Sequence, residues 1–121
     1  MPYIISYLWF PPHLSNTVAQ RYLETIQKYP LISIIKRLIP AAIASVKEGV
    51  EVMVVDEVKG KDLGEAMEYI SKFLVEYRDI EGVRYQARVF NTLNEAMGYI
   101  GKGWFSENPL SWKIFKFNFF F

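Results

Sequence analysis

The stretch "AAIASVKEGVEVMVVDEV", from Ala41 to Val58, constrains the fold more than any other part of the sequence. Two runs rich in apolar and β-branched residues flank Lys47-Glu48-Gly49, and β-branched residues favour strands. Gly49 has no Cβ, so it can adopt the positive φ that a tight hairpin turn requires. The stretch therefore predicts an antiparallel β-hairpin with one strand on each side of the turn.

Two further segments have strand patterns. The run "YIISYLWF" (Tyr3–Phe10) is aromatic and β-branched and stops at two prolines, which predicts a strand buried on both faces. The segment "VRYQARVFN" (83–91) alternates apolar and polar residues, which predicts a strand with one apolar face.

Helical spacing of apolar residues predicts three helices. The first follows residues 15–17, where Thr17 and Gln20 have capping-box spacing, and it ends at Pro30. The second begins at the Asp62 and Glu65 capping-box pair and runs to Tyr77, with Gly82 placed for a left-handed C-terminal residue.

The remaining segments are a third helix and an ambiguous connection. Thr92 and Glu95 are spaced to open a short last helix that ends at Gly101. The segment "LISIIKRLIP" (31–40) fits one helical turn by its spacing and a strand by its β-branched content. We interpret it as a short helical connection.

The resulting order, strand, helix, strand, strand, helix, strand, covers about the first hundred residues and resembles the ferredoxin-like βαββαβ fold. That resemblance implies an α+β protein with a four-stranded antiparallel sheet and two helices on one face. The strands at 3–10 and 50–55 are apolar at both alternating sets of positions, so the second face also needs a cover. A second copy packed sheet to sheet would supply that cover.

In this respect the chain resembles the dimeric α/β-barrel superfamily. That superfamily includes cofactor-free quinol monooxygenases, haem-degrading enzymes, muconolactone isomerases and many proteins of unknown role. The resemblance implies a homodimer or higher homo-oligomer, with residues 1–101 forming the α/β-barrel domain.

Residues 102–121 form an aromatic C-terminal extension. Phe115, Phe117 and Phe119 alternate with polar Lys116 and Asn118, which is typical of a strand with one buried face. We expect the extension to pack on a neighbouring subunit, because so much aromatic surface needs a cover. An interfacial membrane anchor and a non-native extension from a shifted reading frame are the alternatives.

Composition narrows the classes of function. The 14 basic and 13 acidic residues nearly cancel, so no global field recruits nucleic acid or a membrane surface. The absence of cysteine excludes disulfides and cysteine-based zinc sites, and a single histidine excludes a multi-histidine metal site within one chain. We expect a cytoplasmic protein without cofactor, nucleic-acid partner or membrane partner. An RNA-binding module of the same element order would carry aromatics where this chain has Glu51, Asp56 and Glu57.

The candidate ligand-binding residues are Arg84, Gln86, Arg88, Tyr7 and Trp9. The first three share one side of a strand, about 7 Å apart, and would present donors to a carboxylate, phenolate or phosphate. The two aromatics could stack on a planar ligand. The alternatives are an ordinary solvated strand face and plain core aromatics.

His13 is the one candidate for acid-base catalysis, because its charge changes near neutral pH, and the alternative is a surface loop histidine. We therefore predict a homo-oligomeric barrel protein that binds a small aromatic or anionic molecule. A cofactor-free monooxygenase or isomerase and a purely structural oligomer remain open alternatives.

Overall fold

The structure is a computed structural model that describes residues 1–100, with Ile100 described by its backbone alone. The chain divides into two compact units, Met1–Phe90 and Asn91–Phe121. The predicted aromatic extension, residues 102–121, lies outside the described residues.

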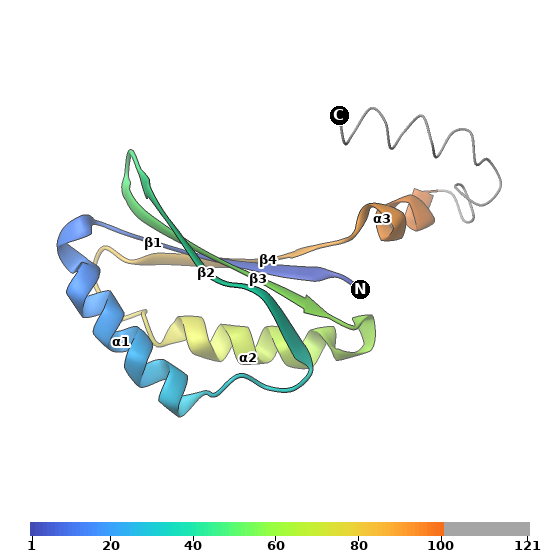
Figure 1. Ribbon diagram of the computed structural model, residues 1–121, viewed down its shortest axis with the longest axis horizontal. Helices are drawn as coiled ribbons and strands as arrows, with labels where there is room; N and C mark the ends of the chain where they lie inside the picture. The colour runs from blue at the N-terminus through green and yellow to red at the C-terminus, as the bar shows by residue number, and fades with distance from the viewer. Residues whose placement is uncertain (101–121) are drawn as a thin grey trace. The chain divides into compact units, whose positions relative to one another are not determined.

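The first unit is an α+β fold built on one four-stranded sheet (Figure 1). Its elements are β1 (Tyr3–Phe10), η1 (Pro12–Leu14), α1 (Ser15–Lys28), β2 (Ile35–Val46), β3 (Gly49–Val58), η2 (Gly60–Asp62), α2 (Leu63–Val75) and β4 (Arg84–Phe90). The strand order is β2-β3-β1-β4, and every neighbouring pair is antiparallel. The sheet and its two helices are compatible with a ferredoxin-like arrangement.

Helices α1 and α2 lie on the same side of the sheet (Figure 1). Alternate residues of β1 point to that side and are buried: Ile4, Ser6, Leu8 and Phe10. One core cluster joins Ile4 to Ala66 and Ile70 of α2, and a second joins Leu8 to Val18 of α1. The other residues of β1 are half-buried, so within the first unit, residues 1–90, only one face of β1 is covered by helices.

The predicted hairpin is confirmed by β2 and β3, with Gly49 at its turn. Gly49 has a φ of 135°, and a Cβ at this position would lie 2.5 Å from the carbonyl oxygen of Phe10. Both the backbone conformation and the close approach of a neighbouring strand therefore require glycine here.

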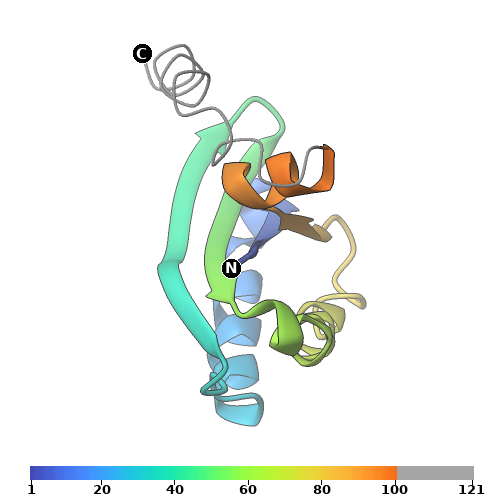
Figure 2. The ribbon, with the colours of Figure 1, turned by 90° about the vertical axis from the view of Figure 1, so that its right-hand side faces the viewer.

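The interpretation of residues 31–40 as a helical connection is wrong, because β2 begins at Ile35. The β-branched content of this segment proved decisive over its helical spacing, since Ile35 pairs with Val58 and is buried in the core. Pairing with β3 shifts register between Arg37 and Ile39 and again between Ile39 and Ala42. Pro40, which cannot donate to a ladder, lies in this irregular stretch, and β2 bends along its length (Figure 2).

The three predicted helices are present, but only one predicted capping box forms. In α3 (Leu93–Ile100), the Glu95 carboxylate accepts from the Thr92 backbone N–H, and the Thr92 hydroxyl accepts from the Glu95 N–H. Helix α1 starts before Thr17, which leaves that residue inside the first turn, and α2 has no side-chain cap. Gly82 does have positive φ, 94°, but α2 already ends at Val75.

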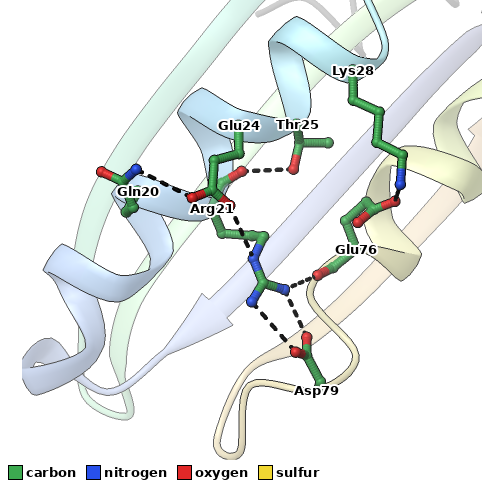
Figure 3. A network of polar contacts seen from close by, with 7 residues as sticks. All are labelled: Gln20, Arg21, Glu24, Thr25, Lys28, Glu76 and Asp79. Carbon is green, nitrogen blue, oxygen red and sulfur yellow. Dashed lines mark hydrogen bonds and ion pairs between the residues drawn. The ribbon is translucent and has the colours of Figure 1, made fainter.

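A cluster of charged side chains links α1 to the end of α2 and the turn that follows it (Figure 3). Arg21 donates to the backbone oxygen of Glu76 and forms an ion pair with Asp79 at 2.7 Å. Lys28 forms a second ion pair, with the Glu76 carboxylate at 2.8 Å. We call these four residues the α1 clamp. Because one partner of each pair, Asp79 or Lys28, is exposed to solvent, the contribution of the pairs to stability depends on salt.

Candidate functional site on the open sheet face

The strand register brings the five candidate ligand-binding residues to one face of the sheet. Trp9 lies opposite Arg84, Tyr7 opposite Gln86 and Ile5 opposite Arg88. Since directly paired residues of antiparallel strands share a face, these side chains lie on the side that the helices do not cover. We call this side the open face.

The open face contains residues of all four strands. By pairing and alternation they are Tyr3, Ile5, Tyr7, Trp9, Lys36, Ile39, Ala42, Ala44, Glu51, Met53, Val55, Glu57, Arg84, Gln86, Arg88 and Phe90. None of them is buried within this single chain. The open face thus has a largely apolar centre, with polar residues along edge strand β4 and near the two ends of β3, as is typical of a surface that meets another macromolecule or a ligand.

The polar row on β4 has free hydrogen-bond donors. Arg84, Gln86 and Arg88 are all exposed and belong to the edge strand. Within residues 1–99, Arg84 and Gln86 make no hydrogen bond or ion pair, while the Arg88 guanidinium lies 5.0 Å from the centre of the Phe90 ring. The row can therefore accept an anion without breaking an existing ion pair.

The two candidate aromatics stack on each other. The rings of Tyr7 and Trp9 are parallel, with 5.3 Å between their centres and 5° between their planes. The Trp9 indole N–H donates to the Glu51 carboxylate at 2.7 Å, which ties the ring to β3. A planar ligand that stacked on the outer face of Trp9 would lie near Arg84, the cross-strand partner of that residue.

His13 does not join this group. It lies in η1, is exposed, and lines a shallow surface hollow with Thr17 of α1 and Glu81 of the loop before β4. The structure therefore gives it no position from which to exchange protons with a ligand on the open face. Among residues 1–99, no group of three or more histidine, cysteine, aspartate or glutamate side chains is placed to hold a metal ion.

The sequence analysis missed a cavity of about 70 Å³ between the sheet and the helices. Leu8, Val52 and Val54 line it from the sheet, Tyr22 from α1, and Ile70 and Phe73 from α2. Most of the lining is apolar, and Phe73 contacts three tyrosine rings within 6.4 Å, those of Tyr22, Tyr69 and Tyr77.

Arg37, one of the residues that line the cavity, forms an ion pair with Asp56. Both oxygens of the fully buried Asp56 carboxylate accept from Arg37, at 2.8 and 3.1 Å. Burial alone would lower the pKa of Arg37, but the hydrogen bond and charge of Asp56 raise it overall, so the guanidinium stays charged. The signal in the sequence is an acid among valines, at a position of β3 that alternation assigns to the apolar face.

No helix within the described part of the chain is long and apolar enough to cross a membrane.

Comparison with known proteins gives no family assignment. No family model matches the sequence, and no curated protein matches it. Among solved structures, the de novo designed protein Foldit4 is similar with a TM-score of 0.47 and 12% identity, covering 75% of this chain and 96% of the designed one. PelD (158-CT) from Pseudomonas aeruginosa PAO1 is similar with a TM-score of 0.42 and 14% identity, over 83% of this chain and 36% of PelD. At these scores neither likeness bears on function.

Proposed function

We propose that two copies of this chain pack open face to open face, as in a dimeric α/β barrel, and hold a small anionic aromatic molecule between the sheets. The observation that carries the proposal is the convergence of Arg84, Gln86, Arg88, Tyr7 and Trp9 on a face that no element of the first unit covers.

The choice of a second copy as the cover follows from the chemistry of the face. Its centre is apolar, with Ile5, Met53 and Val55 side by side across β1 and β3. Its charges have both signs, with arginines on edge strand β4 and Glu51 and Glu57 on the inner strand β3. A two-fold axis through the centre can bring the basic edge of one copy over the acidic row of the other, so the face is self-complementary.

The class of ligand follows from the free donors beside the stacked aromatic pair. A ligand ring that stacks on the outer face of Trp9 extends the pair and gains contact area, while a carboxylate on that ring can meet Arg84 in the bidentate geometry that guanidinium groups favour. The face offers no histidine, so the proposal is for binding and includes no catalytic step.

The assembly is tested by native mass spectrometry and sedimentation of the full chain at micromolar concentration. We expect an even-numbered oligomer, and we expect Val55→Lys to dissociate it, because the new charge lies at the centre of the apolar surface. Leu23→Lys is the matched control, since Leu23 is an exposed apolar residue of α1, 52% accessible, away from the open face. A monomeric wild-type protein would refute the assembly.

Ligand binding is tested by calorimetric titration with salicylate as the probe. We expect Arg84→Ala to weaken binding by at least about tenfold, the lower end for a charge-assisted hydrogen bond. Arg78→Ala, in an exposed arginine of the turn after α2, serves as the control. If the wild type and the Arg84 variant bound salicylate with equal affinity while the dimer stayed intact, the ligand site would be refuted and a purely structural oligomer would be favoured.

A further inference from the structure

The two edges of the sheet differ in how well they are protected against further pairing. Strand β2 forms one edge and β4 the other, and the described part of the chain adds no further strand to either. The β2 edge contains Pro40, which has no backbone N–H, and two register shifts, and both features obstruct pairing with another strand. The β4 edge has no such interruption, because its residues all pair with β1 in one unbroken register. Its outward-facing backbone groups therefore form a regular template for one more strand.

The side of β4 that faces the helices is also incompletely covered. Tyr85 and Val89 lie opposite Leu8 and Ile4 of β1. The two β1 residues are 8% and 0% exposed, whereas Tyr85 is 37% and Val89 is 41% exposed. The described part of the chain thus covers the inner strand but leaves two large apolar side chains of the edge strand in contact with solvent. A strand added beside β4 would bring side chains against both of them.

The sequence of β4 can pair with a second copy of itself in an antiparallel register. A two-fold axis perpendicular to the joined sheet keeps each side chain on the same face in both copies, so the axis passes through a residue. If that residue is Ala87, the whole of β4 is paired. Tyr85 then lies opposite the partner's Val89, which makes an aromatic and β-branched pair, and this pair occurs twice.

Charge excludes the neighbouring registers. With the axis at Ala87, Arg84 lies opposite the partner's Phe90, and Arg88 lies opposite the partner's Gln86, so no arginine directly faces an arginine. Moving the axis by one residue, to Gln86 or to Arg88, places an arginine opposite an arginine, and like charges directly opposed destabilise a strand pair. Larger shifts leave less than half of the strand paired. Self-pairing of β4 therefore has one favoured register.

We propose that β4 forms a contact between copies of this chain, in which two β4 strands pair antiparallel about Ala87 and join two sheets into one. The contact uses backbone groups at the edge, so the side chains of Arg84 and Gln86 stay available on the open face. It goes beyond the sheet-to-sheet contact, since its axis is perpendicular to the sheet and the other axis lies between two sheets. With both contacts, the closed assembly is a tetramer with mutually perpendicular two-fold axes.

Cysteine cross-linking of the full chain tests the register, because the sequence has no cysteine of its own. Ala87→Cys should give cross-linked dimers with a thiol reagent that spans about 5 Å, the Cβ separation of directly opposed residues. Tyr85→Cys and Val89→Cys should cross-link when the two variants are mixed and exchange subunits. Neither should cross-link alone, because each cysteine lies about 13 Å along the strand from its own copy. Ile43→Cys, 71% exposed on edge strand β2, is the control for random collision.

Sedimentation measures the strength of the edge contact in the Val55→Lys variant, which removes the sheet-to-sheet contact. Adding Tyr85→Ala removes both symmetry-related aromatic pairs, so the dissociation constant of the remaining dimer should rise by about 2- to 30-fold. Tyr22→Ala is the matched control, because Tyr22 is a tyrosine of α1 with nearly the same exposure, 38%, and lies outside β4. It should leave the dissociation constant unchanged.

The results separate the edge contact from the sheet-to-sheet dimer. A wild-type dimer that is insensitive to Val55→Lys and cross-links through Ala87→Cys would support the edge contact while refuting the sheet-to-sheet dimer. A monomeric Val55→Lys protein at high micromolar concentration would overturn the edge contact and leave the sheet-to-sheet dimer standing. Equally fast cross-linking of Ile43→Cys and Ala87→Cys would also overturn the edge contact, as would cross-linking of Tyr85→Cys with Ala87→Cys in place of Val89→Cys, since that pair marks a different register.

Discussion

The Arg37–Asp56 pair predicts an asymmetric response to mutation. In Arg37→Met, a carboxylate with no exposed surface loses the only side chain that bonds it within the described residues, and we expect a loss of about 3–5 kcal/mol in the free energy of unfolding at pH 7.5. In Asp56→Val we expect a smaller loss, about 1–3 kcal/mol, because Arg37 is 22% exposed and can turn its guanidinium toward water. The double variant replaces the pair by apolar groups and should be close to the wild type.

Urea unfolding followed by circular dichroism measures these differences. With a slope of about 1.5 kcal/mol per molar urea, the Arg37→Met loss corresponds to a midpoint shift of roughly 2 to 3 M. In this variant the buried Asp56 carboxyl group has lost its cation, so we expect its pKa to be higher in the folded state than in the unfolded state. The variant is then penalised least at low pH, where the carboxyl group is protonated in both states, and the penalty grows as pH rises. The variant should therefore be less destabilised at pH 5 than at pH 8.

Two results would refute this reasoning. If the losses of the single variants simply added in the double variant, the two groups would not be coupled. If Arg37→Met cost less than about 1 kcal/mol and showed no pH dependence, Asp56 would be solvated rather than sealed behind Arg37.

Three further predictions concern the backbone, the α1 clamp and a helix cap. Gly49→Ala should lower the free energy of unfolding, measured by chemical denaturation, by about 1–3 kcal/mol. Gly64→Ala is the control and should be neutral or stabilising, because a Cβ at Gly64 would meet open space. Similar values for both variants would contradict the positive-φ argument. The hydrogen bond from Lys28 lowers the pKa of Glu76, and the hydrogen bond from Arg21 lowers the pKa of Asp79. The clamp therefore stabilises the folded state at pH values above the unfolded-state pKa values of these acids, and this stabilisation is lost as pH falls below about 4.5. The midpoint of acid unfolding should shift with salt concentration, and a salt-independent midpoint would contradict the prediction. Thr92→Ala removes the reciprocal cap of α3 and should speed amide hydrogen exchange in its first turn, and unchanged exchange would show that the cap is dispensable.

The elements of the sheet could be predicted because their signals are local. Gly49 between two β-branched runs dictates a hairpin, and the alternation on β4 separates Arg84, Gln86 and Arg88 from the apolar side of the same strand. Those patterns depend only on the pleat and on backbone sterics. The segment before Pro40 was assigned incorrectly because its helical spacing and its β-branched content conflict, and pairing with β3 decides between them.

The sequence by itself determined the order of elements, the glycine turn and the residues that share one face of a strand, since each depends on neighbours a few positions away. Only the tertiary structure decided that Tyr7 and Trp9 lie opposite Gln86 and Arg84, because cross-strand register is set by pairing between distant segments. It also decided that His13 lies apart from that face. The cavity and the Arg37–Asp56 pair arise from how two helices rest on the sheet, and the packing of side chains across that interface is not encoded in any local pattern.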